Sequence, residues 1–200
     1  MIPESQPLEQ FFLELVERHY SHDIGLRDPQ ISNYVANLLT EFCHTDTLGK
    51  IHDAADKPLD DVGAMLLESD PVFGNAPSFD RERQVRKHIG DYALFFTGMY
   101  PESINRWRLR RNRMESFIDF VKTGKESYHI VSKFEYFEYQ KVAPLFQQLS
   151  ARFEDCVYGL NMVKNELAEM QHPIFRLNTN PDDRLDDDET RSNRPSDLIM

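Results

Sequence analysis

The chain of 200 residues has little glycine and little cysteine. Its eight glycines are scattered, which disfavours a protein of strands and tight turns and favours helices. Its two cysteines, Cys43 and Cys156, have neither the CxxC spacing of a metal site nor the pattern of a secreted disulfide framework. Each lies in a helical apolar run, so we expect two small buried thiols.

Long apolar runs and catalytic motifs are also absent from the sequence. No window approaches 18 consecutive apolar residues, and the first ten residues lack the basic and apolar parts of a signal peptide. No P-loop, GxGxxG, HExxH or GxSxG motif occurs. We therefore expect a soluble cytoplasmic protein with no contact to a membrane. Neither an enzyme class nor a cofactor is predicted.

The charges of the chain are unevenly distributed along the sequence. The formal net charge of −11 disfavours non-specific binding of nucleic acid by the chain as a whole. Residues 81–113, however, contain nine Lys or Arg and three Asp or Glu, a net charge of +6 against −17 for the rest. This asymmetry makes the basic segment the place where an acidic partner is expected.

Three amphipathic helices are predicted in the first 68 residues. Apolar residues recur at helical spacing from residue 8 onward, in a helix that ends near Tyr20. Asp28 and Pro29 are typical of an N-cap followed by proline at the first helical position. The predicted inward residues are Leu8, Phe11, Phe12, Leu15 and Val16; Ile31, Val35, Leu38, Leu39 and Phe42; and Leu59, Val62, Met65 and Leu66.

Two more helices are predicted in the middle of the chain, after a loop at residues 69–80. The fourth helix, from Asp80 to Met99, is apolar on nearly all sides in its second half, which predicts a buried central helix. Gly90 is expected to allow close helix packing, whereas Gly98, in a left-handed conformation, and Pro101 are expected to end the helix. The fifth helix, residues 114–137, is predicted to carry Met114, Phe117, Ile118, Val121, Tyr128 and Val131 on one face.

The clearest pattern in the sequence is a heptad repeat in the last predicted helix, residues 144–171. All eight core positions are apolar, as coiled-coil-like packing requires. Two interpretations stay open: a long core helix of a bundle, or a seam between two copies of the chain. The two heptad positions hold Phe146, Phe153, Leu160 and Leu167, and Leu149, Cys156, Val163 and Met170.

The composition changes after residue 178, where no apolar period remains. Six acidic residues fall within residues 182–189, which is typical of a flexible tail. The segment lacks the glycine and the ligand spacing of a calcium loop. The sequence therefore predicts an all-α fold: a single-domain helical bundle of about six helices over residues 1–172, followed by a disordered acidic tail over residues 173–200.

Two Glu-x-x-His pairs have the spacing that di-iron four-helix proteins use. On helical wheels both pairs lie away from the apolar faces, whereas such ligands must point into a bundle. No metal site is therefore predicted, and a ferritin-like di-metal protein is kept as an alternative. Asp91 is expected to be a buried, paired carboxylate rather than a ligand. The residues of the alternative are Glu41, His44, Asp91, Glu126 and His129, with Glu14 or Glu17 as a further ligand.

The segment RWRLRRNR, residues 106–113, contains five arginines around the only tryptophan. Guanidinium groups suit the recognition of carboxylates or phosphates, and the indole can stack on a base or a guanidinium. The plain interpretation, a solvated connection, has the most weight; of the two functional interpretations, an acidic protein partner is preferred to a regulatory nucleic-acid contact. The predicted contact residues are Arg106, Trp107, Arg108, Arg110, Arg111 and Arg113.

The stretch GDYALFFTGMYPES, with YVANLLTEF before it and KTGKESYHIVSKF after it, resembles a group of helical bacterial proteins of uncharacterised activity. A GD-x-x-LF-x-x-G-x-x-P-E pattern recurs in that group. The similarity covers most of residues 5–170 and excludes the tail. It implies a helical fold and a bacterial cytoplasm, and it assigns no activity or functional residue.

These observations favour a non-enzymatic interaction or scaffold protein. Self-association through the heptad helix and binding of an acidic partner through residues 106–113 are the two modes of interaction that the sequence suggests. The di-metal protein and the nucleic-acid binder are the alternatives.

Overall fold

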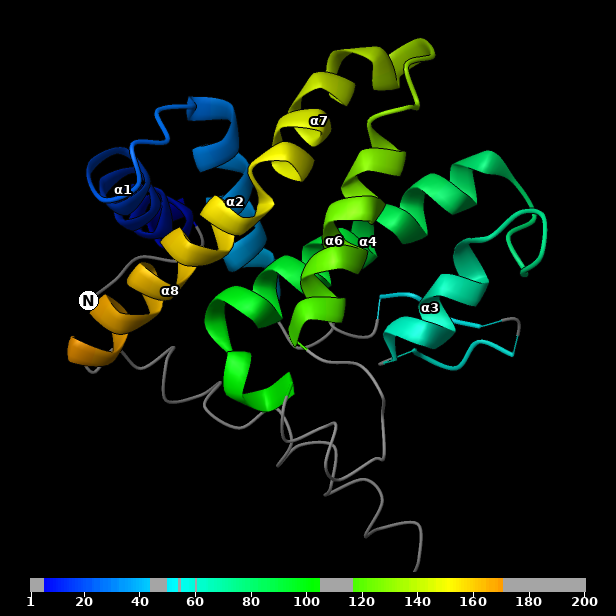
Figure 1. Cartoon of the computed structure of the whole chain (residues 1–200), viewed down its shortest axis with the longest axis horizontal. Helices are drawn as coiled ribbons and strands as arrows, with labels where there is room; N and C mark the ends of the chain where they lie inside the picture. Colours follow the sequence, from blue (N-terminus) through cyan, green and yellow to red (C-terminus); the bar gives the residue numbers. More distant parts are fainter. Residues whose placement is uncertain (1–5, 44–49, 54, 60, 105–116, 171–200) are drawn as a thin grey trace, which may run out of the picture. The chain divides into compact units, whose positions relative to one another are not determined.

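The structure is a computed structural model that describes residues 6–43, 50–53, 55–59, 61–104 and 117–170. Its elements are α1 (Gln6–His22), α2 (Pro29–Phe42), α3 (Val62–Ser69), α4 (Phe79–Met99), α6 (Phe117–Val131), the 3-10 helix η2 (Phe137–Lys141), α7 (Ala143–Ala151) and α8 (Phe153–Glu169) (Figure 1). The only β pairing among the described residues is one bridge between His52 and Pro58. The predicted all-α fold is therefore confirmed.

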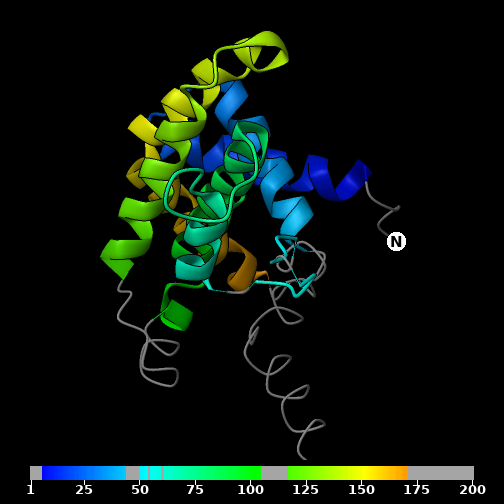
Figure 2. The same ribbon diagram turned by 90° about the vertical axis from the view of Figure 1, so that its right-hand side faces the viewer.

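The described residues up to Asn165 belong to one compact unit, and those from Glu166 onward belong to a second. The contacts below lie within the first unit. In it, α4 packs against α2, α3 and α6, while α1 packs against α2 and α7 packs against α6 (Figures 1 and 2). The predicted acidic tail, residues 173–200, lies outside the described residues.

The local sequence sets the connection between α1 and α2. Gly25, at φ +67°, supplies a left-handed residue that most side chains would disfavour. The carboxylate of Asp28 then accepts hydrogen bonds from the backbone N–H of Gln30 and Ile31, at 2.9 and 3.4 Å. Pro29 is the first residue of α2, where it costs no hydrogen bond. The predicted N-cap is confirmed.

The second half of α4 is the centre of this unit, as the sequence predicted. Every residue from His88 to Met99 is buried. A Cβ added to Gly90 would lie 2.5 Å from the ring of Tyr128, so glycine does allow the close approach of α4 and α6. Van der Waals packing at this distance requires the absence of a side chain.

The prediction that Gly98 ends α4 in a left-handed conformation is wrong. Gly98 remains helical, and its missing side chain makes room for Leu160 of α8, which a Cβ would approach to 2.5 Å. α4 continues to Met99, and the N–H of Tyr100 still donates to the carbonyl of Phe96 at 2.9 Å. Residues 101–104 are helical again, with proline at their start.

The fifth predicted helix is shorter than expected, and its buried face is different. Within the described residues α6 spans Phe117–Val131, so it ends six residues before the predicted end at 137, and Ile118 is 62% exposed although it was assigned to the core face. Phe120 is buried instead, and the true face continues through Gly124 and Ser127. Because the middle of this face consists of small residues, a prediction based on large apolar residues did not identify it. Tyr128 and Val131 are buried as predicted.

The last predicted helix is two helices, and the expectation of one continuous helix is wrong. α7 ends at Ala151 and α8 begins at Phe153, with Arg152 between them at φ −109° and ψ 22°. The core interpretation of the heptad pattern is nevertheless confirmed for seven positions, while Met170 is 48% exposed. Those seven side chains are not exposed for a seam between two copies. They are Phe146, Leu149, Phe153, Cys156, Leu160, Val163 and Leu167.

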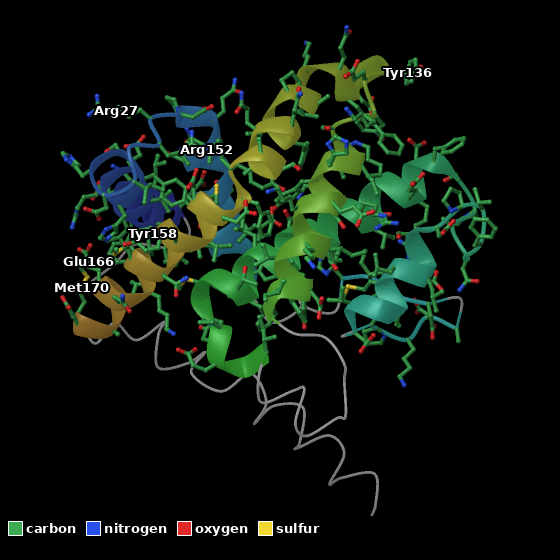
Figure 3. All side chains as sticks on the ribbon, in the orientation of Figure 1. Arg27, Tyr136, Arg152, Tyr158, Glu166 and Met170 are labelled. Carbon is green, nitrogen blue, oxygen red and sulfur yellow. The ribbon has the colours of Figure 1, made fainter. Side chains whose placement is uncertain are left out.

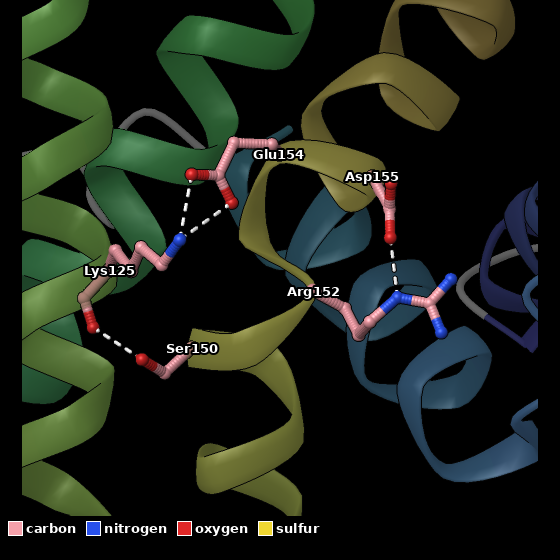
Figure 4. A network of polar contacts seen from close by, with 5 residues as sticks. All are labelled: Lys125, Ser150, Arg152, Glu154 and Asp155. Carbon is pink, nitrogen blue, oxygen red and sulfur yellow. Dashed lines mark hydrogen bonds and ion pairs between the residues drawn. The ribbon is translucent and has the colours of Figure 1, made fainter.

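Polar contacts surround the break between α7 and α8 (Figure 4). The hydroxyl of Ser150 donates to the carbonyl of Lys125 in α6 at 2.8 Å, and the ammonium of Lys125 binds the carboxylate of Glu154 at 2.8 Å. The guanidinium of Arg152 pairs with Asp155 one turn later. Contacts to α6 therefore connect both sides of the break to one neighbouring helix.

Candidate functional site

The structure does not bring the candidate metal ligands together. Glu41 on α2 and both Glu126 and His129 on α6 are exposed, and His44 lies outside the described residues. Asp91 is buried and contacts other partners. Within the described part of the chain, no group of three or more His, Cys, Asp or Glu is arranged to hold a metal ion.

Residues 106–113, with Arg106, Trp107, Arg108, Arg110, Arg111 and Arg113, lie outside the described residues, so their contacts stay a prediction. Three of the four Lys and Arg residues of α4 have partners within the chain: Arg81, Arg83 and Lys87. Arg81 donates to the carbonyl of His52 at 2.9 Å. The guanidinium of Arg83 lies 3.8 Å from the ring centre of Tyr139, a cation–π contact. The first half of α4 is therefore no open basic surface.

A buried polar cluster joins α2, α4 and α6. Asp91 of α4, 5% exposed, accepts the O–H of Tyr34 from α2 at 2.5 Å and the O–H of Tyr128 from α6 at 2.8 Å. Its second oxygen accepts from the ammonium of Lys87 at 2.6 Å, one turn earlier on α4. The expectation of a buried, paired carboxylate is confirmed.

The chemistry of this cluster is that of a structural contact. Burial, and secondarily the charge of Asp91, raises the pKa of Tyr34 and of Tyr128 well above the usual value, so both phenols stay protonated donors. The ring of Phe146 packs on both phenols, at 5.5 and 5.6 Å between ring centres. The cluster thus joins three helices through one carboxylate, and its two phenols are not ionised nucleophiles at neutral pH.

The two thiols are equally unreactive in this setting. Cys156 is buried and Cys43 is half-buried. Burial raises the pKa of Cys156 to about 12 and that of Cys43 to about 11. Because the thiolate is the nucleophile, neither cysteine is activated at neutral pH.

Four large apolar side chains are exposed around the α3–α4 connection, and sequence reasoning missed their exposure. They belong to the last turn of α3, the connecting loop and the first residue of α4 (right side of Figure 1). The loop itself was predicted, and a valine and two phenylalanines among its prolines and asparagine were the available signal. We call these residues the apolar group: Leu67, 60% exposed; Val72, 74%; Phe73, 90%; and Phe79, 70%.

Hydrogen bonds fix the conformation of the loop that presents the apolar group. One carboxylate oxygen of Asp70 accepts from the N–H of Val72 at 2.8 Å and from the N–H of Phe73 at 2.9 Å. The N–H of Asn75 donates to the carbonyl of Leu67 at 2.9 Å, which folds the loop back onto the end of α3. The most exposed side chains therefore extend from a turn whose backbone is held in place.

No family model, no curated protein and no solved structure matches the chain. None of the described helices is both long and apolar enough to cross a bilayer. The function of this chain therefore has to be inferred from its own residues.

Proposed function

We propose that this chain is a non-enzymatic interaction protein of the bacterial cytoplasm that binds another polypeptide through the apolar group. The observation that carries this proposal is Phe73, 90% exposed on a hydrogen-bonded turn, with Val72 74% exposed beside it. Leaving a phenylalanine side chain in water forgoes about 2 kcal/mol of burial free energy. Large apolar side chains on a fixed loop are typical of a binding surface.

The polar groups of the chain support a binding role rather than a catalytic one. The buried carboxylate of Asp91 is occupied by three donors from within the chain. The pKa values of both cysteines are raised rather than lowered. An activated thiol nucleophile has a lowered pKa, so these two cysteines support binding rather than thiol catalysis as the class of function.

The basic segment at residues 106–113 has a second place in the proposal. Its arginines would contact carboxylates of an acidic partner, with charge-assisted hydrogen bonds that set orientation. Three of the four cations of α4 have contacts within the chain, so this segment would supply most of the basic part of the interaction. The apolar group would supply the main part of the affinity.

Site-specific photo-crosslinking tests the proposal. A benzophenone amino acid replaces Phe73 in the full chain, which is expressed in bacterial cells and irradiated. The matched control carries the same amino acid at Tyr158, which is 53% exposed on α8 (Figure 3). We expect adducts of discrete mass from position 73 and none from position 158. Equal or absent adducts at both positions, in folded protein, would overturn the proposal.

A further inference from the structure

We infer that the polypeptide bound by the apolar group is a second copy of this chain, so that the α3–α4 connection is a self-association surface. The inference rests on the proposed function and names its partner. Self-association was also suggested by the heptad pattern, but seven of the eight heptad side chains are buried within the chain. The apolar group, in contrast, is exposed and offers a surface for a contact between copies.

The exposed area of the apolar group is large enough for a weakly associating homodimer. With about 200 Å² for a phenylalanine and less for valine and leucine, the four side chains expose about 500 Å² in total. Two such groups facing each other would remove about 1,000 Å² from water, which lies at the lower limit of specific interfaces.

The local charge balance favours a second copy over a charged partner. Residues 67–87 contain four acidic and four basic residues, so the whole formal charge of −11 lies elsewhere in the chain. Two copies that meet at this segment therefore avoid the like-charge repulsion that other acidic regions would produce. An acidic or basic partner, in contrast, would find no net charge of opposite sign here.

The fixed turn lowers the entropic cost of pairing. The carboxylate of Asp70 already holds the backbone of Val72 and Phe73, so only side-chain rotamers have to be ordered on association. A two-fold pair presents the same residues on both sides, and it closes without further growth. We therefore expect a reversible dimer rather than a filament.

Sedimentation equilibrium of the purified full chain tests the inference, at protein concentrations from about 1 to about 200 µM, a range that suits an interface of this size. We expect a monomer–dimer equilibrium whose Kd rises at least tenfold in the double variant Val72→Ser/Phe73→Ser. Both side chains are mostly exposed, so the variant keeps the fold, which circular dichroism checks. The control Tyr158→Ser, on α8, should leave Kd unchanged.

The outcomes separate this inference from the proposed function. A strict monomer at all concentrations overturns self-association, and so does a dimer whose Kd is the same in Val72→Ser/Phe73→Ser. If photo-crosslinking at position 73 then yields adducts with another protein, the proposed function stands and only the identity of the partner is wrong. If position 73 yields no adducts, both proposals fail.

Discussion

Asp91 is the residue on which the buried polar contacts of this fold converge. A carboxylate in an apolar interior is destabilising by several kcal/mol unless hydrogen bonds and an opposite charge compensate it. Three hydrogen-bond donors reach the carboxylate of Asp91: Tyr34 of α2, Lys87 of α4 and Tyr128 of α6. Each donor thus contributes more to the free energy of unfolding than an ordinary surface contact does, because its removal leaves part of a buried charge without a hydrogen bond.

Replacement of Tyr128 by phenylalanine tests the cohesion of this cluster. The change removes one O–H donor and keeps the ring, so we expect unfolding free energy to fall by about 1.5–3 kcal/mol. For a chain of this size that corresponds to a Tm lower by about 4–10 °C. Urea titration and thermal melting, both followed by circular dichroism, measure the two quantities.

Tyr158→Phe is the control for Tyr128→Phe, because Tyr158 is 53% exposed on α8. We expect a change within about 0.5 kcal/mol for this variant. Equal stabilities of Tyr128→Phe and Tyr158→Phe would mean that the contact with Asp91 contributes nothing to stability.

Asp70 gives the loop a defined response to pH. Its pKa lies below the ordinary aspartate value of 3.8, because the N–H groups of Phe73 and Val72 bind the charged form. A lowered folded-state pKa means that the turn is stabilised above about pH 4 and loses this contribution as pH falls through the folded-state pKa. We expect the amide ¹H shifts of Val72 and Phe73 to titrate with a midpoint below 3.8. A midpoint at or above 3.8 would contradict the hydrogen-bonded turn.

Helix contacts in this fold depend on glycine where two elements cross. Gly90 faces the ring of Tyr128, Gly98 faces Leu160, and Gly124 faces Phe153. In isolation each glycine weakens its helix by about 1 kcal/mol relative to alanine. The close packing that it permits outweighs this loss, because the neighbouring rings have no space to retreat in a dense interior.

Gly90→Ala separates these two effects. Helix propensity alone would stabilise the variant, but the new Cβ would lie 2.5 Å from the Tyr128 ring. We expect a net loss of about 1–2 kcal/mol, since overpacking outweighs the gain in propensity. Asn37→Ala, at an exposed position inside α2, is the control and should gain about 0.5 kcal/mol. Stabilisation by both substitutions, measured in urea, would refute the close contact.

Among the elements, the features that were predicted correctly from the sequence are those that residues close in sequence determine. The Asp28 cap, the loop after α3 and the buried half of α4 depend on residues close in sequence, and all three are confirmed. The break at Arg152 and the helical state of Gly98 depend on contacts with distant helices, such as those of Lys125 and Leu160. No periodicity in one segment contains that information.

The candidate site was harder to predict than the fold, for a physical reason. An apolar residue in a sequence is expected in the core, and the position of Phe73 and Val72 in a predicted loop does not by itself show that their side chains are exposed. Their exposure follows from the bonds of Asp70 and Asn75, which turn the loop back on α3. Asp91, in contrast, was a single charge in an apolar run, and its pairing was predictable from the cost of burial.

For the whole molecule, the excess of negative charge opposes the meeting of two copies at most surfaces. The chain carries −11, while residues 67–87 are neutral. Like-charge repulsion between two copies acts over distances of about a Debye length, about 10 Å at 0.1 M salt. Added salt therefore strengthens an apolar contact between two copies of this chain, whereas it weakens a contact made by arginines.

We expect self-association through the apolar group to strengthen as NaCl rises from about 20 to about 300 mM, because screening removes repulsion and leaves apolar burial intact. Kd should fall severalfold, as measured by sedimentation equilibrium at constant pH. The double variant Val72→Ser/Phe73→Ser should keep a Kd at least tenfold above that of the unmodified chain at both salt concentrations, which excludes a general salting-out effect. Association that weakens with salt would instead assign the contact to residues 106–113 and to carboxylates of the second chain, because only attraction between opposite charges is lost on screening.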